Sequence, residues 1–138
     1  MSEGGRLSPA GSTTLAEFRE KSDAIVAAVL SRTGEVEHAP FSKGHRATVV
    51  ERMKYAQKTV ESFLAVPSVA LIREHMEWLV DRVPREGVSI ASFIGGLKIH
   101  KEAVEEVLSA AAAEEVLPYF DFMISEIEQI ADQPKRES

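Results

Sequence analysis

The 138-residue sequence contains no cysteine, which excludes disulfide bonds, thiol catalysis and thiolate metal sites. Long apolar runs are missing as well, since no segment approaches the ~18 residues that a membrane-spanning helix needs. The opening residues, MSEGGRLSPAGSTT, include no apolar stretch of the kind that marks a secretory signal peptide. We therefore expect a cytoplasmic protein with no membrane partner.

Positive charge is also in short supply, with 16 Lys and Arg against 22 Asp and Glu and a formal net charge of −6. A phosphate backbone would be repelled, so we expect no nucleic-acid partner. Nine acidic residues and no basic one lie between Glu102 and Asp132, whereas four basic residues gather earlier: Arg46, Arg52, Lys54 and Lys58. The acidic stretch is either a set of solvated helix faces or a surface that orients a basic partner or a second subunit.

Hydrophobic residues make up 44% of the chain and charged residues 28%, which is typical of a globular protein. A chain of this length builds one core rather than two. We predict a flexible tail over residues 1–13, a single helical domain over 14–132 and a second polar tail over 133–138.

Apolar residues recur at intervals of three and four, which is the period of amphipathic helices. This spacing predicts helices over residues 15–32, 45–65, 69–83, 89–113 and 118–130. Five residues mark their ends: Thr14 (three residues before Glu17, a capping-box spacing), Gly34, Pro84, Ser89 and Pro118. No long stretch alternates with period two, so the predicted fold class is all-α, a globin-like bundle of five to six helices.

Two features of the predicted helices call for a packing explanation. Gly95 and Gly96 lie inside a helix, where each costs about 0.5–1 kcal/mol relative to alanine. We expect another helix to cross closely there. The last helix is apolar on more than one side, which predicts a homodimer in which terminal helices pack side by side through Phe120, Met123, Ile124 and Ile127.

No arrangement of catalytic residues is recognisable, because the sequence lacks a nucleophile with an adjacent base and a Gly-rich phosphate loop. Glu35 and His38 form one E-x-x-H pair near Pro40, and a di-iron bundle needs two such pairs on core-facing helices. We therefore predict no enzyme activity, no metal and no cofactor.

His75 and His100 each lie in an apolar helical neighbourhood. One hypothesis makes them haem ligands, because a globin pocket needs a histidine that faces a flat apolar cavity. The simpler interpretation is a partly buried histidine bonded to a neighbour. For His100, phosphotransfer is a third hypothesis, prompted by the adjacent Lys101.

The segment from Val83 to Val107 combines a helix end, the basic Arg85, a Gly-Val-Ser turn over 87–89, and a long helix with Phe93, Ile94 and Leu97. This pattern resembles the RsbR-type sensor domain, the N-terminal non-haem globin-like domain of bacterial stressosome proteins. The resemblance extends over about residues 20–130, including Trp78, Leu79 and the acidic closing helix. It implies a globin-like fold without haem, a dimer, and a sensory input for signalling.

The sequence thus favours a non-catalytic sensory or regulatory domain in stress-response signalling. Such a domain would act through dimerisation, through a protein partner in a signalling complex, and with room for a small apolar ligand. Two alternatives stay open: a haem-binding globin-type sensor, which a Soret band would reveal, and a helical scaffold or adaptor domain.

Overall fold

The computed structural model describes residues 7–33 and 46–132, and within these ranges it contains helices and no strand. The elements are α1 (Ser12–Glu20), α2 (Ser22–Thr33), α3 (Arg46–Ala65), α4 (Val69–Arg82), the 3₁₀ turn η2 (Val83–Glu86), α5 (Ile90–Val107) and α6 (Ala110–Asp132). The predicted all-α fold class is confirmed, and the bundle is consistent with a globin-like arrangement.

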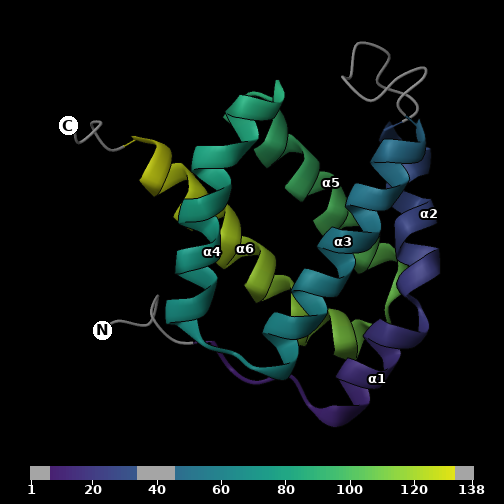
Figure 1. Ribbon diagram of the computed structural model, residues 1–138. Coiled ribbons are helices and arrows are strands. Elements are labelled where there is room, and N and C mark those ends of the chain that lie inside the picture. Colours follow the sequence, from purple (N-terminus) through teal and green to yellow (C-terminus); the bar gives the residue numbers. More distant parts are fainter. Residues whose placement is uncertain (1–6, 34–45, 133–138) are drawn as a thin grey trace.

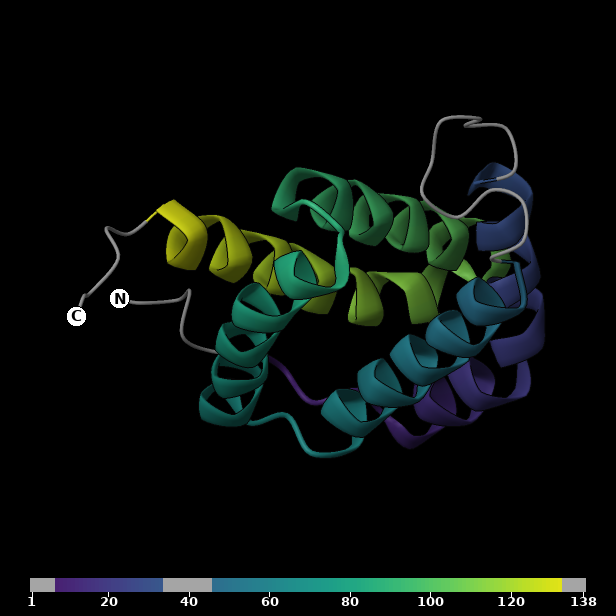
Figure 2. The ribbon, with the colours of Figure 1, turned by 45° about the horizontal axis from the view of Figure 1, so that its top comes forward.

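The helices form two layers, with α3 and α4 in front of α5 and α6 in the view of Figure 1. Turning the molecule brings α5 and α6 to the top and leaves α3 and α4 below them, while α1 and α2 close one side (Figure 2). Helix α6 is central and packs against α5, α4 and α1. Its buried residues join those of the other helices in one core that includes Phe18, Ile25, Ile72, Met76, Tyr119 and Phe120.

Ion pairs tie the helices together around this core. The guanidinium of Arg73 on α4 donates two hydrogen bonds, of 2.9 and 3.1 Å, to the carboxylate of Glu126 on α6. Arg32 on α2 lies 2.6 Å from Glu106 on α5. The Arg73–Glu126 pair is partly buried, because Glu126 is 7% exposed. The Arg32–Glu106 pair is exposed, and pairs of that kind contribute about 0–1 kcal/mol, so it selects the neighbours of its helices more than it stabilises the fold.

Serine caps begin α4 and α5. The hydroxyl oxygen of Ser68 accepts a hydrogen bond from the backbone N–H of Leu71 at 3.2 Å, and that of Ser89 accepts one from Ser92 at 3.0 Å. The prediction of Ser89 as a cap is confirmed. Pro84 follows the end of α4 as predicted, and Gly87 then takes a left-handed φ of 87°.

The N-terminal helix expected over residues 15–32 is in fact two helices, which part at Lys21. The capping box predicted from Thr14 and Glu17 does not form, since Gly11 precedes the helix without a side-chain cap and Glu17 binds elsewhere. Residues 7–13, expected to be a tail, are part of the fold: the Tyr119 hydroxyl donates to the Ser8 carbonyl at 2.8 Å. Gly34 lies outside the described residues.

Pro118 was expected to begin the last helix, and this prediction is wrong. Helix α5 ends at Val107, α6 begins at Ala110, and Pro118 lies inside α6. The break falls at Ser109, whose hydroxyl oxygen accepts a hydrogen bond from the N–H of Ala112 at 3.2 Å. Pro118 is exposed, so water can reach the turn of α6 in which the proline interrupts a backbone hydrogen bond.

Candidate functional site

His100 lies in the core, where 1% of its surface is exposed. Its Nε2 lies 2.7 Å from Oε1 of Gln57 on α3, and its ring packs edge-on against Phe120 with 4.8 Å between centroids. Burial lowers the pKa of His100 to about 4, so the ring is neutral at pH 7 and its Nε2–H donates to the amide oxygen. Nε2 of Gln57 is buried with no hydrogen-bond partner among the described residues.

His75 lies on α4, half-buried between two aromatic rings. It stacks on Trp78 with 5.6 Å between centroids and meets Phe63 of α3 edge-on at 5.8 Å. Burial lowers its pKa as well. Each of the two histidines therefore has protein neighbours of its own, so the structure does not bring them together as a pair of haem ligands.

The four residues predicted to form the dimer interface are buried inside the single chain. Phe120, Met123, Ile124 and Ile127 are at most 9% exposed. The physical reason is that α1, α4 and α5 pack around α6, so its apolar sides face three neighbours of the same chain. The extra apolar surface of α6 thus reflects its central position in the fold.

Gly95 and Gly96 do not mark a helix crossing among the described residues. A Cβ atom built on either glycine would meet no described atom within 4 Å. The predicted close approach is therefore absent here.

The residues that the structure describes contain no group of three His, Asp or Glu side chains placed to hold a metal ion. Glu35 and His38 lie outside these residues. None of the described helices is long and apolar enough to cross a membrane.

The outer surface of α3 and α4 carries the large exposed apolar side chains, a feature that the sequence analysis missed. Tyr55, Val66, Leu71 and Trp78 are between 46% and 60% exposed. Lys54 and Lys58 are exposed beside Tyr55, and the guanidinium of Arg82 lies 5.0 Å from the Trp78 ring centroid. These side chains lie on α3, on α4 and on the link between the two helices. The signal in the sequence was the set of apolar residues that fall off the buried stripe of each helix.

A groove of about 450 Å³ runs between α5 and α6 on the other layer. It is lined by Lys98, Lys101, Glu102, Glu105, Asp121, Ile124, Ser125 and Glu128. The ammonium of Lys101 pairs with the carboxylate of Asp121 at 2.6 Å. Among the other charged residues that line the groove, the acidic ones outnumber the basic one, Lys98. We call this the α5–α6 groove, and it collects part of the acidic stretch noted in the sequence.

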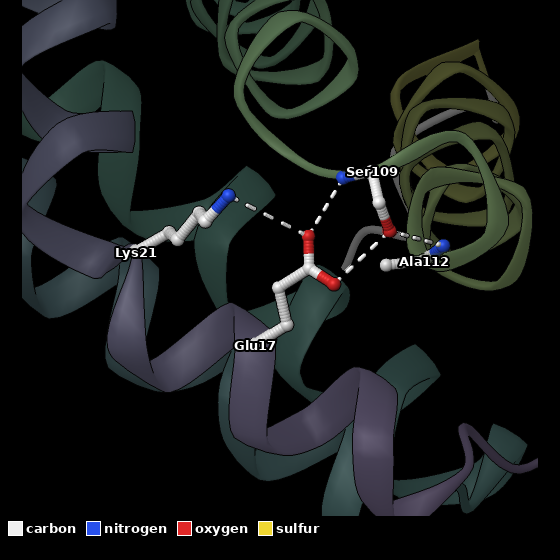
Figure 3. Close-up of polar contacts among 4 residues, drawn as sticks. All are labelled: Glu17, Lys21, Ser109 and Ala112. Carbon is white, nitrogen blue, oxygen red and sulfur yellow. Dashed lines mark hydrogen bonds and ion pairs between the residues drawn. The ribbon is translucent and has the colours of Figure 1, made fainter.

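A third polar arrangement joins the N-termini of α1 and α6 (Figure 3). The carboxylate of Glu17 accepts hydrogen bonds from the Ser109 backbone N–H at 2.6 Å and from its hydroxyl at 3.0 Å, and Lys21 lies 3.9 Å away. In return, Glu115 of α6 accepts a hydrogen bond from the Gly11 N–H at 2.9 Å. These backbone N–H groups lower the pKa of both glutamates. Each carboxylate caps the other helix, where the helix dipole favours negative charge.

Residues 13–127 match the phycobilisome protein family. This chain belongs to that family. The match runs from the second residue of α1 into α6 and includes the whole of α2 to α5. No match was found among curated proteins or among solved structures.

Membership of the phycobilisome family corrects two predictions made from the sequence. The chain is not an RsbR-type stressosome domain, so a role in stress-response signalling is not supported. The haem-binding alternative also loses its support, since the family is one of bilin proteins. The turn and helix start on which the resemblance rested are generic features that many helical proteins share.

A bilin is an open-chain tetrapyrrole, and the residues of this chain do not fit its covalent attachment. The thioether bond to such a pigment needs a cysteine thiolate as the nucleophile. None of the 138 residues is a cysteine. Among the described residues, the α5–α6 groove is lined by charged groups rather than by the apolar walls that enclose a planar pigment.

Proposed function

We propose that this protein is a non-enzymatic assembly subunit of the phycobilisome family that carries no thioether-linked bilin. The observation that carries the proposal is the absence of cysteine from a chain whose residues 13–127 match the family. Family membership supports a role in a multi-subunit assembly, and the missing thiol removes covalent pigment attachment from that role.

The placement of the reactive side chains supports a non-enzymatic role. His100 is neutral and bonded to an amide, and His75 is packed between two rings. In the part of the chain that the structure describes, no hydrogen bond or ion pair joins either histidine to a nucleophile or an acid, as a general base would need. Oligomer formation and a cytoplasmic location belong to the same proposal.

The test combines a pigment assay with a measurement of mass. The purified full chain is incubated with biliverdin, denatured in acidic urea and desalted, and the visible absorbance that stays with the protein is recorded. We expect no retained absorbance, whereas a bilin-carrying phycobiliprotein treated in parallel retains its colour. Pigment that survives denaturation on this chain would overturn the proposal.

Sedimentation velocity between 1 and 500 µM then tests the assembly role. We expect the weight-average mass to rise with concentration. A strictly monomeric chain over this range at low salt would contradict assembly by self-association.

A further inference from the structure

We propose that Lys21 is a hinge, and that residues 7–20, which we call the N-terminal clasp, swing away from α6 while the rest of the bundle stays folded. In the open form α1 and α2 join into one straight helix. The closed clasp covers one side of α6, so the hinge controls access to that side. This inference goes beyond the assembly function, because it concerns a motion within one copy of the chain.

The bend at Lys21 has no local cause in the sequence. Between Ser12 and Thr33 the chain contains neither glycine nor proline, the residues that most often interrupt a helix. Lys21 has φ −97° and ψ 13°, away from helical values. Helical hydrogen bonds persist across it, from the Lys21 N–H to the Glu17 carbonyl and from the Ile25 N–H to the Lys21 carbonyl, both 2.9 Å. A change in the backbone angles of one residue is therefore enough to straighten the segment.

The apolar pattern fits a straight helix as well as the bent arrangement. Phe18, Ile25 and Val29 are spaced by seven and four residues, so in one continuous helix they fall on the same side. For this reason the spacing predicts a single helix over residues 15–32. A segment whose pattern suits two arrangements is the kind of element that switches between two states.

The bend is held by groups from distant parts of the chain. Among the described residues, hydrogen bonds join the clasp to α6 through these pairs: Glu17 with Ser109, Gly11 with Glu115, and Ser8 with Tyr119. An ion pair joins it to α3 through Arg19 and Glu61. Figure 3 shows the Glu17 carboxylate reaching from α1 to the start of α6. Most of these groups lie at the surface, where water competes for their hydrogen bonds, so each contact is easily broken.

The clasp is anchored in the core less deeply than α2. Helix α1 buries Thr14 and Phe18, so it contributes one large apolar side chain to the core. Helix α2 buries Ile25, Val26 and Val29 and packs along α5. Opening therefore withdraws Phe18 and breaks the surface contacts, while the packing of α2 on α5 is kept. Segments held in this way open at a lower free energy than the whole domain.

The open form uncovers a side of α6 that is otherwise buried. Tyr119 is 1% exposed in the closed form, and its hydroxyl is bonded to the clasp. Ser109, at the start of α6, loses the carboxylate that accepts from its N–H. Release of the clasp thus makes the Tyr119 phenol and the first turn of α6 accessible together.

Double electron–electron resonance measures the hinge in the full chain, because no native thiol competes for the labels. Thr13→Cys on α1 and Glu128→Cys on α6, both at exposed positions, carry the two nitroxides. Thr13 lies about 12 Å along the helix from Lys21, so opening moves its label by about 10 Å. We expect a major distance from the closed clasp and a minor, different distance from the open clasp.

Substitutions at the hinge shift the two populations in opposite directions. Lys21→Ala favours the straight helix and Lys21→Gly opposes it, because alanine has a much higher helix propensity than glycine. We expect the ratio of open to closed forms to be about fivefold higher with alanine than with glycine. The matched control is Lys58→Ala and Lys58→Gly, the same changes at an exposed position inside α3, which should leave the ratio unchanged.

Glu17→Ala/Glu115→Ala removes the two carboxylates that fasten the clasp to α6, so the open fraction should rise further. Hydrogen exchange followed by mass spectrometry shows how much of the chain opens. We expect the amides of the clasp to exchange faster in this variant than in the unmodified chain. The amides of α2 and α5 should keep their protection.

Two results would overturn the inference. One is a distance distribution that does not differ between Lys21→Ala and Lys21→Gly. The other is a loss of protection in α2 together with the clasp, because the chain would then open beyond Lys21. Neither result affects the proposed assembly function, and neither pigment retention nor a strictly monomeric chain would affect the hinge.

Discussion

Two polar arrangements in this molecule differ in burial and in how completely their groups are bonded. The His100–Gln57 pair lies in the core, is joined by a hydrogen bond of 2.7 Å, and leaves the Gln57 amide nitrogen without a partner among the residues that the structure describes. The junction of α1 and α6 lies at the surface, where Glu17 and Glu115 accept hydrogen bonds from the N-terminal groups of each other's helix.

The difference separates two uses of polar groups. A buried amide nitrogen without a partner costs about 1–3 kcal/mol, so the core pair reduces stability relative to an apolar pair of the same shape. The junction lowers the free energy of unfolding little, because water is available to its polar groups. Its hydrogen bonds fix which helix ends meet. The two arrangements also respond to acid in different pH ranges.

The largest effect is expected from acidification of the unmodified protein. The pKa of His100 is about 4 in the folded state and near 6.5 in the unfolded state. Between these values the unfolded state takes up a proton that the folded state does not, so the free energy of unfolding decreases as pH falls. We expect a loss of about 3 kcal/mol between pH 7 and pH 4, measured by urea denaturation.

The control is Gln57→Leu/His100→Leu, which removes the titrating ring and the unbonded amide together. We expect its free energy of unfolding to change by about 3 kcal/mol less over the same range. His75→Gln is measured in parallel, because burial lowers the pKa of His75 too and its contribution has the same sign. An unchanged pH dependence in the double variant would contradict the assignment to His100.

A smaller effect is expected from Ser109→Ala at the junction. The substitution removes the hydroxyl that accepts from the Ala112 N–H and donates to Glu17, while the backbone bond to Glu17 is kept. Loss of an N-cap typically costs about 1 kcal/mol, which a urea midpoint resolves. Ser125→Ala on the same helix is the control, since its hydroxyl accepts from the Gln129 side chain and caps no helix. Equal losses of unfolding free energy in the two variants would show that the cap at Ser109 contributes nothing to stability.

The smallest effect is expected from Glu115→Gln, read out by hydrogen exchange of the Gly11 amide. The pKa of Glu115 is lowered because it accepts from Gly11 and then from the Thr14 side chain. Its contribution is therefore complete above the ordinary value of 4.5 and is lost as pH falls further. We expect Gly11 protection to decline with acid in the unmodified chain and to be lower but flat in the variant. Glu114→Gln, at the neighbouring exposed position, should leave protection unchanged.

Local patterns in the sequence were enough to predict most helices. The bounds of α3 and α4 lie within a residue or two of the prediction, because Ser68, Pro84 and the apolar spacing act within one or two turns. The cap at Ser89 was predictable for the same reason. The all-α class follows from these local signals together.

The breaks at Lys21 and Ser109 were not predictable in this way. Ser109 begins α6 with the help of Glu17, which is 92 positions away in the chain, and this contact outweighs the local signal of Pro118. A serine before a run of alanines was the available clue, because such a serine is a good N-cap. The burial of Phe120 and its neighbours likewise depends on three other helices, so the sequence could not show whether α6 faced its own chain or a second one.

The candidate surfaces were predictable only in part. The acidic stretch was visible in the sequence, but its arrangement as a groove needs the pairing of α5 with α6. Tyr55 and Trp78 appeared as residues on the flanks of amphipathic helices, and only the packing shows that both stay exposed. The absence of cysteine is the one site property that the sequence establishes alone.

The exchange of caps between α1 and α6 also sets an order of events on the ribosome. Helix α1 receives its capping carboxylate from Glu115, which is synthesised 104 residues after Gly11. Until that residue emerges, the early helix lacks both its cap and the neighbour against which it packs, and short isolated helices are only marginally stable in water. Helix α1 therefore reaches its final form only when the first turns of α6 have been synthesised.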